Sequence, residues 1–448
     1  MSLNDTIVAC ATPAGYSSIG VIRISGDQTL SLVKKIFVSR QKIQDFETNH
    51  AYYGNIIDPD NNDVIDKIIA TFYLTPHSYT GEDVVELSCH GNPLIIDRIT
   101  KILTGMGARI AQRGEFTKRA LLNGKIDLLQ AEAVLDTVNA PCNEARKLAI
   151  TQYEGKLSDK IYELRSKIVD LLSFVEANID FPEEEDIQNS DIGIEGGLKS
   201  IIEEIDELLK GAEIGVKIKE GYKVLITGRT NVGKSTLFNK LVGYDRAIIH
   251  EEPGTTRDYI EDRIEVSELY LCLFDTAGIF NTAAGPDKIA QDRTISLVEQ
   301  SDLILLMFDG SEPMNEEDLY LYNLTKDKDK ILIVNKIDIN MLLNESEILC
   351  DSIKISAKTG KNIDLLIQNI KSKLLPKFDH KQILLTRQRH IGALKNAKEY
   401  FIRAQKAYSP ETIAFELHAA LDVIGELTGK IMRKEILDRI FEEFCIGK

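Results

Sequence analysis

The sequence has no long apolar run, no paired cysteines and no excess of basic residues, and each absence argues against a class of protein. The longest apolar runs, such as residues 303–308, fall far short of the roughly 20 residues that a membrane-spanning helix needs. Its six cysteines include no CxxC pair and have no His at zinc-finger spacing, which argues against a disulfide framework or a structural zinc site. Because no basic segment followed by an apolar one opens the sequence, we expect a cytoplasmic protein with no membrane association.

The charge balance is acidic. The 54 Lys and Arg residues face 70 Asp and Glu residues, which gives a formal net charge of -16. Nonspecific affinity for nucleic acid comes mainly from Lys and Arg side chains that neutralise phosphates. Any RNA substrate is therefore expected to need a local patch or a partner to hold it.

The pattern of apolar residues divides the 448 residues into regions of different type. Residues 1–122 combine β-rich runs at 19–24 and 68–73 with a helical stretch near 94–103, which predicts an α+β domain. From Leu148 to Ile179 apolar residues recur every three to four positions, which predicts one long helix, and a second helix is expected at 198–209. Pro182 and the acidic residues 183–186 should end the first helix in a solvated loop.

The chain changes character again at about residue 216. Apolar runs at 223–227, 269–274, 303–308 and 331–334 alternate with helical or loop-like stretches as far as residue 376, which predicts a mostly parallel sheet of βαβ units. Helical spacing returns over residues 413–431. We therefore predict one helical domain made of residues 123–215 and 377–448, with the α/β domain of residues 216–376 inserted between them.

A phosphate-binding motif opens the inserted domain. Residues 228–235 match GxxxxGK(S/T) between a predicted strand and a predicted helix. In such a loop Lys234 reaches the β and γ phosphates and Ser235 holds Mg²⁺. A hydroxyl from Thr256, in the Gly254–Asp258 segment, is expected to complete the Mg²⁺ shell. The alternative is that this segment is only a polar turn.

Three further motifs point to guanine. DTAG at 275–278, NKID at 335–338 and SAK at 356–358 resemble those of the translation-factor class of GTPases. In that class the carboxylate corresponding to Asp338 pairs with two guanine donors, which adenine cannot offer. The residues expected to contact GTP are Asn231, Val232, Gly233, Lys234, Ser235, Thr236, His250, Glu251, Glu252, Pro253, Gly254, Thr255, Thr256, Asp275, Thr276, Ala277, Gly278, Asn335, Lys336, Asp338, Ser356, Ala357 and Lys358.

The residue after the DTAG motif is Ile279, which cannot orient a water molecule as the Gln of Ras-like enzymes does. Another group must then stabilise the transition state. Asn231 is a natural ligand for a monovalent cation beside the phosphates, and the alternative is that it only shapes the loop.

Motifs outside this domain carry a more specific resemblance. RISG at 23–26, YTGED at 79–83, GEF at 114–116, NGK at 123–125 and CIGK at 445–448 resemble those of the MnmE (TrmE) family, and generic GTPases lack them. The resemblance implies three parts: a folate-binding-like α+β amino-terminal domain that dimerises, a helical domain from two segments, and an inserted Ras-like P-loop G domain.

The resemblance also implies ligands and residue roles. It places 5-formyltetrahydrofolate or a related folate at Arg23, Glu86, Lys125 and Lys448, Mg²⁺ at Ser235 and Thr256, and K⁺ at Asn231, His250, Glu252 and Thr255. It places the switch II acidic residue, normally Glu, at Asp287. The alternative for Asp287 is a solvated carboxylate in a loop without a catalytic role. Cys445 has two interpretations. It acts as a nucleophile or an acid toward the pyrimidine, or it is a small, buried apolar residue. The implied catalytic residues are Asn231, Lys234, Thr256, Asp287 and Cys445.

The function that the resemblance implies is K⁺-assisted GTP hydrolysis coupled to tRNA modification. A homodimer would form a heterotetramer with an MnmG-type partner that uses FAD and NADH, and together they would add a carboxymethylaminomethyl-type group at C5 of the wobble uridine. The alternatives are a regulatory or ribosome-assembly switch and a membrane-remodelling GTPase. The first usually carries an added basic RNA-binding domain and the second a basic amphipathic helix, and neither is evident in the sequence.

Overall fold

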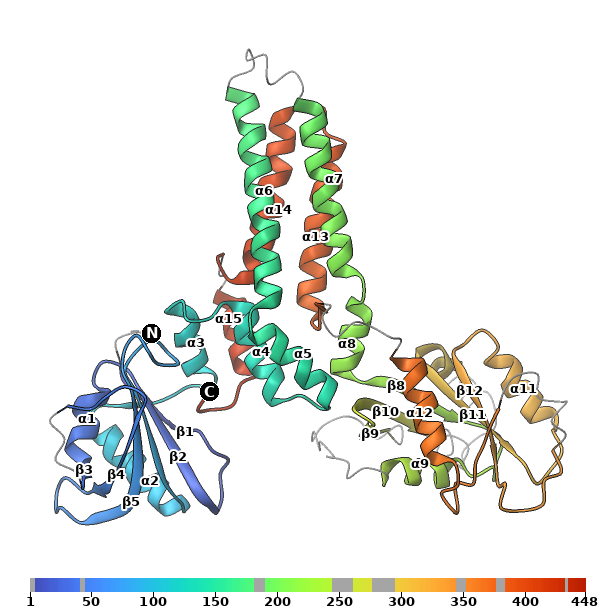
Figure 1. Cartoon of the computed structure of the whole chain (residues 1–448), viewed down its shortest axis with the longest axis horizontal. Helices are drawn as coiled ribbons and strands as arrows, with labels where there is room; N and C mark the ends of the chain where they lie inside the picture. The colour runs from blue at the N-terminus through green and yellow to red at the C-terminus, as the bar shows by residue number, and fades with distance from the viewer. Residues whose placement is uncertain are drawn as a thin grey trace. The chain divides into compact units, whose positions relative to one another are not determined.

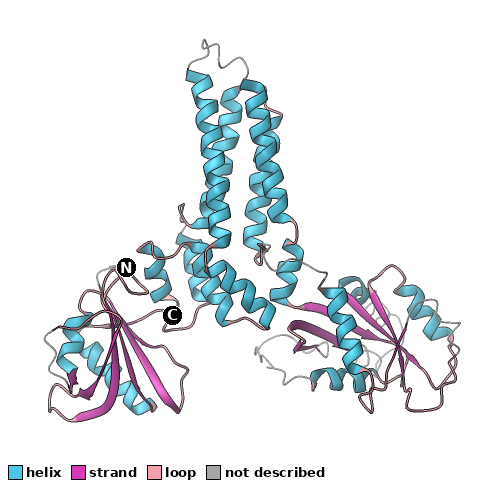
Figure 2. Ribbon diagram, in the orientation of Figure 1, coloured by secondary structure: helices cyan, strands magenta, loops and turns pink. Residues whose placement is uncertain are grey.

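The structure is a computed structural model that describes residues 5–40, 45–180, 190–243, 261–275, 295–343, 352–375, 383–431 and 434–448. The chain forms two compact units. Unit 1 comprises residues 1–135, 152–172 and 417–448, and unit 2 comprises residues 136–151 and 173–416. Figure 2 shows one group of strands in each unit, with helices filling the rest of the described chain.

Unit 1 contains a seven-stranded sheet in the order β3-β4-β5-β6-β2-β1-β7. Only the β1–β7 pair is parallel. Its strands are β1 (Ile7–Cys10), β2 (Ser17–Ser25), β3 (Phe37–Ser39), β4 (His50–Ile57), β5 (Val64–Tyr73), β6 (Val84–Gly91) and β7 (Arg109–Ile110). Helices α1 (Thr29–Ile36) and α2 (Pro93–Gly105) share a buried apolar cluster with one face of this sheet. The α+β prediction for this region is confirmed.

Among the described residues, the opposite face of the sheet is covered only in part. Near β1 it packs against Phe116 of α3 (Glu115–Leu122). Farther along, the alternation of β4 and β5 turns Tyr53 and Ile69 outward as a cross-strand pair, and Val38 of β3 lies exposed as well. About half of each of these three side chains is exposed, with relative exposures of 47%, 48% and 49% respectively. A group of large apolar side chains on one sheet face is typical of an interaction surface.

The remaining helices of the first half depart from the prediction at one point. The structure has α4 (Leu128–Val138), α5 (Asn143–Tyr153) and α6 (Lys156–Asp180), so the single helix expected from Leu148 to Ile179 is wrong. The break lies at Gly155, whose φ of +91° is a left-handed conformation that ends a helix. The periodic pattern continues across the break because both helices bury apolar residues at helical spacing.

The second helical segment lies beside the first. Helix α7 (Ser190–Leu209) packs along α13 (Gln388–Gln405), although nearly 180 residues separate them, and Figure 1 shows the two side by side. The other helices are α8 (Ala212–Glu220), α14 (Pro410–Thr428) and α15 (Lys434–Glu442). The insertion of an α/β domain into a helical domain is therefore confirmed, but α14 ends before Ile431, the last residue of the predicted stripe.

The inserted domain has a six-stranded sheet in the order β13-β12-β11-β8-β10-β9. All neighbouring strands are parallel except β9 and β10, which form an antiparallel hairpin at one edge. The strands are β8 (Tyr222–Thr227), β9 (Glu261–Val266), β10 (Leu269–Asp275), β11 (Leu303–Asp309), β12 (Lys330–Asn335) and β13 (Ser352–Lys354). Helices α9 (Lys234–Val242) and α12 (Ile363–Leu374) contribute to the apolar cluster of one face, and α11 (Glu316–Leu324) to that of the other. The mostly parallel sheet is confirmed.

Among the described residues, no helix combines the length and the apolar character that crossing a membrane requires.

Candidate functional site

The predicted phosphate loop connects β8 to α9 in the inserted domain. Gly228 and Gly233 have φ values of +156° and +98°, and a Cβ atom at Gly233 would lie 2.4 Å from Nδ2 of Asn335. Asn231, at φ +62°, is also left-handed. The glycines therefore allow the tight curl that turns backbone N–H groups toward one point at the start of α9, which is the arrangement that binds phosphate.

Lys234 is buried at the first position of α9. Its Nζ donates to the carbonyls of Gly228 and Arg229, each at 2.8 Å, so the ammonium group lies inside the curl of the loop. Ser235 and Thr236 follow on the exposed first turn of α9. Asp275 ends β10, which pairs with β8, so its backbone lies beside the start of the loop. The ammonium group of Lys234 and the hydroxyl-bearing residues Ser235 and Thr236 therefore lie together at the start of α9.

Asn335 joins two of the predicted loops. Its Nδ2 donates to the carbonyl of Val232 at 2.7 Å, and its Oδ1 accepts from the backbone N–H of Ala357 at 2.9 Å. Ser356, which precedes Ala357, turns its Oγ toward the N–H of Thr359 at 3.1 Å. The NKID and SAK motifs are therefore attached to the phosphate loop.

Lys336 and Asp338 form the side of this site where the base is expected. Lys336 has a left-handed φ of +67°, and its Nζ lies 2.5 Å from Oδ2 of Asp309, the buried residue at the end of β11. Burial alone would raise the pKa of Asp309, but hydrogen bonds from Lys336 and Ser311 lower it overall. A hydrogen bond from the Ser356 side chain lowers the pKa of the exposed Asp338, which favours the carboxylate that would accept from guanine N–H groups.

The sequence patterns did not single out two residues of this site. Asp309 had a signal that could have found it, since it ends a buried strand beside the phosphate loop, as Asp275 does. Arg229 is buried in the phosphate loop and pairs with Glu312 at 2.7 Å and with Asp318 at 3.6 Å. Its partners come from the segment after β11, so only the folded chain reveals the role.

Part of the predicted nucleotide site lies outside the described residues. These positions are His250, Glu251, Glu252, Pro253, Gly254, Thr255, Thr256, Thr276, Ala277, Gly278 and Asp287. Lys358 lies exposed beside Ala357.

A second group of predicted residues gathers in unit 1. Arg23 of β2 lies directly opposite Glu86 of β6, and its Nε donates to Glu86 Oε1 at 2.8 Å. Its Nη1 donates to the carbonyl of Gly447 at 3.1 Å. Burial and the nearby Arg23 charge lower the pKa of Lys448. Arg23 and Glu86 therefore meet at one half-buried, charged site although 63 positions separate them. The tail, more than 400 positions from Arg23, reaches the same site.

The tail is fixed by backbone contacts as well. The N–H of Phe116 donates to the carbonyl of Lys448 at 3.2 Å, and Arg113 forms a β-bridge with Ile446. A Cβ atom at Gly447 would lie 2.6 Å from the carbonyl oxygen of Cys10, so this position in the tail requires glycine. Aromatic rings line the site, because the Arg23 guanidinium carbon lies 5.6 Å from the centre of the Phe116 ring.

Two predicted residues of this group lie apart from the pair. Lys125 Nζ donates to the carbonyl of Pro76 at 2.9 Å. Cys445 is exposed, and its carbonyl accepts from the N–H of Gly114 at 3.3 Å. The small buried apolar role is therefore wrong for Cys445, since the side chain faces solvent.

The parallel sheet, the glycine-shaped phosphate loop and the NKID and SAK loops define a P-loop GTPase, inserted here into a helical protein. Comparison with known proteins specifies the family. The family described as MnmE helical domain matches residues 128–445, and the family described as GTP-binding protein TrmE N-terminus matches residues 6–125. The chain belongs to the MnmE family of tRNA modification GTPases.

Individual relatives match along the whole chain. The tRNA modification GTPase MnmE of Aquifex aeolicus is 41% identical over 100% of both chains, and that of Desulforamulus reducens is 36% identical over 100% of both. Among solved structures, Era of Aquifex aeolicus bound to GDP and AlF4⁻ is 28% identical, with a TM-score of 0.27, over 42% of this chain and 69% of its own. The resemblance inferred from the motifs is confirmed, and so is GTPase activity in tRNA modification.

Proposed function

We propose that this GTPase uses K⁺ to assist GTP hydrolysis and couples hydrolysis to modification of the wobble uridine of tRNA. In this proposal, a homodimer and an FAD- and NADH-dependent partner form a heterotetramer in the cytoplasm. Together they add a carboxymethylaminomethyl-type group at C5 of the uracil. The observation that carries the proposal is identity to tRNA modification GTPases along the entire chain, combined with a nucleotide site whose described loops are joined by Asn335.

The residues of the phosphate loop fit the two proposed cations. Asn231 exposes a carboxamide in a left-handed bend of the loop, which suits a monovalent cation beside the phosphates. Ser235 offers its hydroxyl at the start of α9 for Mg²⁺, with Thr256 as the proposed second hydroxyl. When bound, K⁺ would add positive charge where the transition state accumulates negative charge. The residues proposed to hold K⁺ are Asn231, His250, Glu252 and Thr255.

The pair in unit 1 fits a folate. Arg23 and Lys448 offer positive charge for the carboxylates of a glutamate tail, and the Glu86 carboxylate suits the donor edge of a pterin. All three lie at one half-buried site beside the Phe116 ring. The folate would supply a one-carbon unit when bound. Lys125, held at Pro76, belongs to this proposal as an additional contact.

The amino-terminal sheet fits the proposed homodimer. Val38, Tyr53 and Ile69 leave an apolar area on the part of the face that α3 does not cover. A second copy of the same face would bury these side chains, and a two-fold dimer uses one patch twice.

GTP turnover in KCl and in NaCl at equal ionic strength tests the cation. We expect faster turnover in KCl for the natural protein. The variant Asn231→Gly keeps the left-handed backbone and removes the amide oxygen, so its turnover should be slow and equal in both salts. Asn239→Ala, at an exposed position of α9, serves as the control and should keep the K⁺ effect. Equal rates in both salts for the natural protein would refute K⁺ assistance.

The uridine chemistry needs a separate assay. Purified protein, the FAD-dependent partner with NADH, a folate as the one-carbon donor, glycine as the amine donor and unmodified tRNA should yield a modified wobble nucleoside that mass spectrometry detects only when GTP is present. Formation of the same nucleoside without GTP would contradict the coupling.

A further inference from the structure

The β9–β10 hairpin connects the two segments expected to respond to the nucleotide. The segment with Thr256 immediately precedes β9, and the DTAG motif begins at the last residue of β10. Because both segments are joined directly to this hairpin in the sequence, a displacement of either one would be passed on to the hairpin. The contacts of the hairpin determine which other element such a displacement would reach.

The turn of the hairpin holds two residues in a disfavoured conformation. Ser267 and Glu268 have φ values of +50° and +74°, in the left-handed region that glycine and asparagine adopt most easily. The tight two-residue turn of a hairpin requires positive φ at both residues, so the pairing of Val266 with Leu269 accounts for these values. The side chain of Glu268 forms hydrogen bonds with residues outside the turn.

The contacts of the turn lead to α5. Glu268 Oε1 accepts from Asn143 Nδ2 at 3.3 Å, and its Oε2 accepts from Lys371 Nζ of α12 at 2.8 Å. Glu265 of β9 accepts from the backbone N–H of Asn143 at 3.2 Å. Asn143 is the first residue of α5, where helix N–H groups lack partners within the helix. The hairpin therefore supplies acceptors to Asn143, whereas Cys142 Sγ accepts from the N–H of Ala145. The Lys371 hydrogen bond also lowers the pKa of Glu268.

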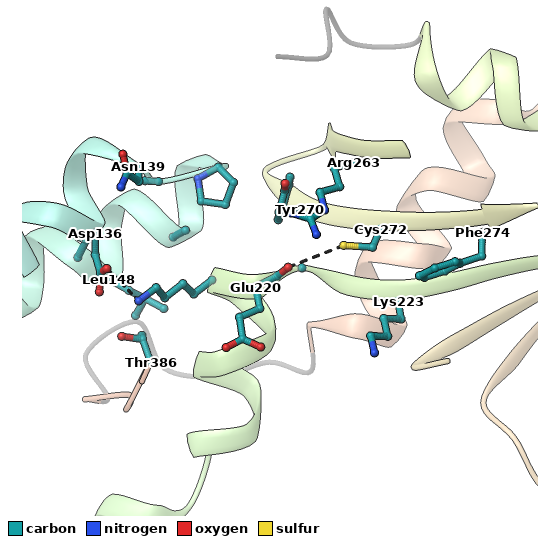
Figure 3. Close-up of a pocket in the computed structure, with 16 residues that line it drawn as sticks. Asp136, Asn139, Leu148, Glu220, Lys223, Arg263, Tyr270, Cys272, Phe274 and Thr386 are labelled. Carbon is teal, nitrogen blue, oxygen red and sulfur yellow. Dashed lines mark hydrogen bonds and ion pairs between the residues drawn. The ribbon is translucent and has the colours of Figure 1, made fainter. Parts of the chain in front are cut away.

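Beyond this contact, Ala145 and Leu148 of α5 share a buried apolar cluster with Tyr270 of β10, and a cavity of about 670 Å³ is lined by residues of both elements. Ala145, Leu148 and Ala149 of α5 are among the residues that line it. Tyr270, Cys272 and Phe274 line it from β10, and Figure 3 labels these three together with Leu148. In the part of the chain that the structure describes, polar contacts at the first residue of α5 and the apolar cluster around Ala145 and Leu148 therefore both join the hairpin to α5.

We propose that Glu268 is a positioning residue that couples the nucleotide state of the G domain to α5. It ties the hairpin between the two nucleotide-responsive segments to Asn143, so a displacement of the hairpin is passed on to α5. The inference rests on the GTPase cycle and requires neither the folate nor the uridine chemistry.

The native cysteines offer a readout of this movement. Cys272 lines the cavity, Cys142 immediately precedes α5, and Cys89 lies buried in the sheet of unit 1. The full-length protein is treated with a maleimide reagent in GDP and in GDP with aluminium fluoride, and peptide mass spectrometry gives the labelling rate of each thiol. We expect the rates at Cys272 and Cys142 to differ between the two states by about fivefold or more, a typical coupling between sites, and the rate at Cys89 to stay unchanged.

Two variants distinguish the effect of the Glu268 side-chain contacts from the effect of backbone strain in the turn. Glu268→Gly removes the carboxylate and relieves the left-handed strain, so the hairpin should stay folded while the difference at Cys272 and Cys142 disappears. Ser267→Gly relieves strain in the same turn and leaves the contacts of Glu268 in place, so it should keep the difference. Glu268→Gln, which loses the ion pair to Lys371 but keeps an oxygen toward Asn143, should reduce the difference and serves if Glu268→Gly does not fold.

The proposal is overturned if the natural protein labels equally in both states, if both Glu268 variants keep its difference, or if Ser267→Gly loses the difference as well. GTP turnover, measured in parallel, should match the natural rate in all three variants. Loss of tRNA modification with natural labelling differences would count against the proposed function and not against this coupling.

Discussion

The Asn335 side chain links Val232 of the phosphate loop to Ala357 of the SAK loop, with one hydrogen bond of 2.7 Å and another of 2.9 Å. Asn335 is buried, so water cannot readily replace either bond. One carboxamide therefore holds the phosphate-binding and base-binding loops in a fixed relation.

Asn335→Ala should weaken guanine nucleotide binding. The variant leaves the Val232 carbonyl and the Ala357 N–H without their partner, and a buried unsatisfied group costs about 1 to 3 kcal/mol, or roughly 5- to 150-fold in affinity. Titration with a fluorescent GDP analogue measures the change. Asn323→Ala, at an exposed position of α11, is the control and should bind as the natural protein does. Natural affinity in Asn335→Ala would mean that the two loops hold their positions independently.

Asp338→Asn should change the base preference of the nucleotide site from guanine to xanthine. A carboxylate accepts from the two donors of guanine, whereas an amide can donate to the oxygen that xanthine carries in place of the amino group. Because hydrogen bonds to charged groups contribute about 1.5 to 3 kcal/mol each, GTP should bind roughly 10- to 150-fold more weakly or worse. Competition among GTP, XTP and ATP is the measurement. A variant that still preferred GTP over XTP would show that another residue reads the base.

Unit 1 should lose stability in acid. Asp5 accepts from Arg109 and Arg119 at 2.8 and 2.7 Å, and these bonds, led by that from Arg109, lower its pKa. A lowered pKa in the folded state means that the stabilisation is fully present above the unfolded value of about 3.9 and is lost as pH falls through the folded pKa. Hydrogen exchange of β1, measured between pH 6 and pH 3 and corrected for the intrinsic rate, should show this loss of protection. Asp5→Asn should weaken the dependence, whereas Asp97→Asn, at an exposed position of α2, should leave it intact.

Gly447→Ala should displace the tail from the Arg23 site. The added Cβ would meet the Cys10 carbonyl oxygen at 2.6 Å, and φ at this position is +98°, so alanine is both crowded and strained. Loss of the Arg23 hydrogen bond to the tail should weaken binding of 5-formyltetrahydrofolate by about tenfold, the equivalent of one charged hydrogen bond. Calorimetric titration measures this. Gly105→Ala, where the structure leaves open space at the end of α2, should bind the folate normally. Full folate affinity in Gly447→Ala would show that the tail does not contribute to folate binding.

Local patterns predicted much of the architecture because they depend on neighbouring residues. The runs at 223–227, 269–274, 303–308 and 331–334 became β8, β10, β11 and β12, since a strand buried on both faces reads as a continuous apolar run. The helix break at Gly155 was missed because a single glycine does not interrupt an apolar stripe. The turn at Ser267 and Glu268 carries no Asn-Gly or Asp-Gly signal, so the sequence did not predict the hairpin that it forms.

The candidate site was predictable to the extent that its motifs are contiguous. The phosphate loop, NKID and SAK could be placed from their spacing, but the bond from Asn335 to Val232 spans 103 positions. The pairing of Arg23 with Glu86 depends on the register of β2 with β6, and the position of the tail depends on a bridge between Arg113 and Ile446. Such long-range relations are properties of the folded chain, so motifs alone indicated the residues and not their contacts.

The bridge between Arg113 and Ile446 has a consequence for synthesis. The whole inserted domain lies between these two residues in the sequence, so a chain leaving the ribosome exposes the amino-terminal sheet long before residues 445–448 can reach it. Domains generally fold as units in the order of their synthesis. A ribosome that stops within the inserted domain would therefore release a product whose amino-terminal sheet is present, while its charged site around Arg23 lacks the contacts of the tail.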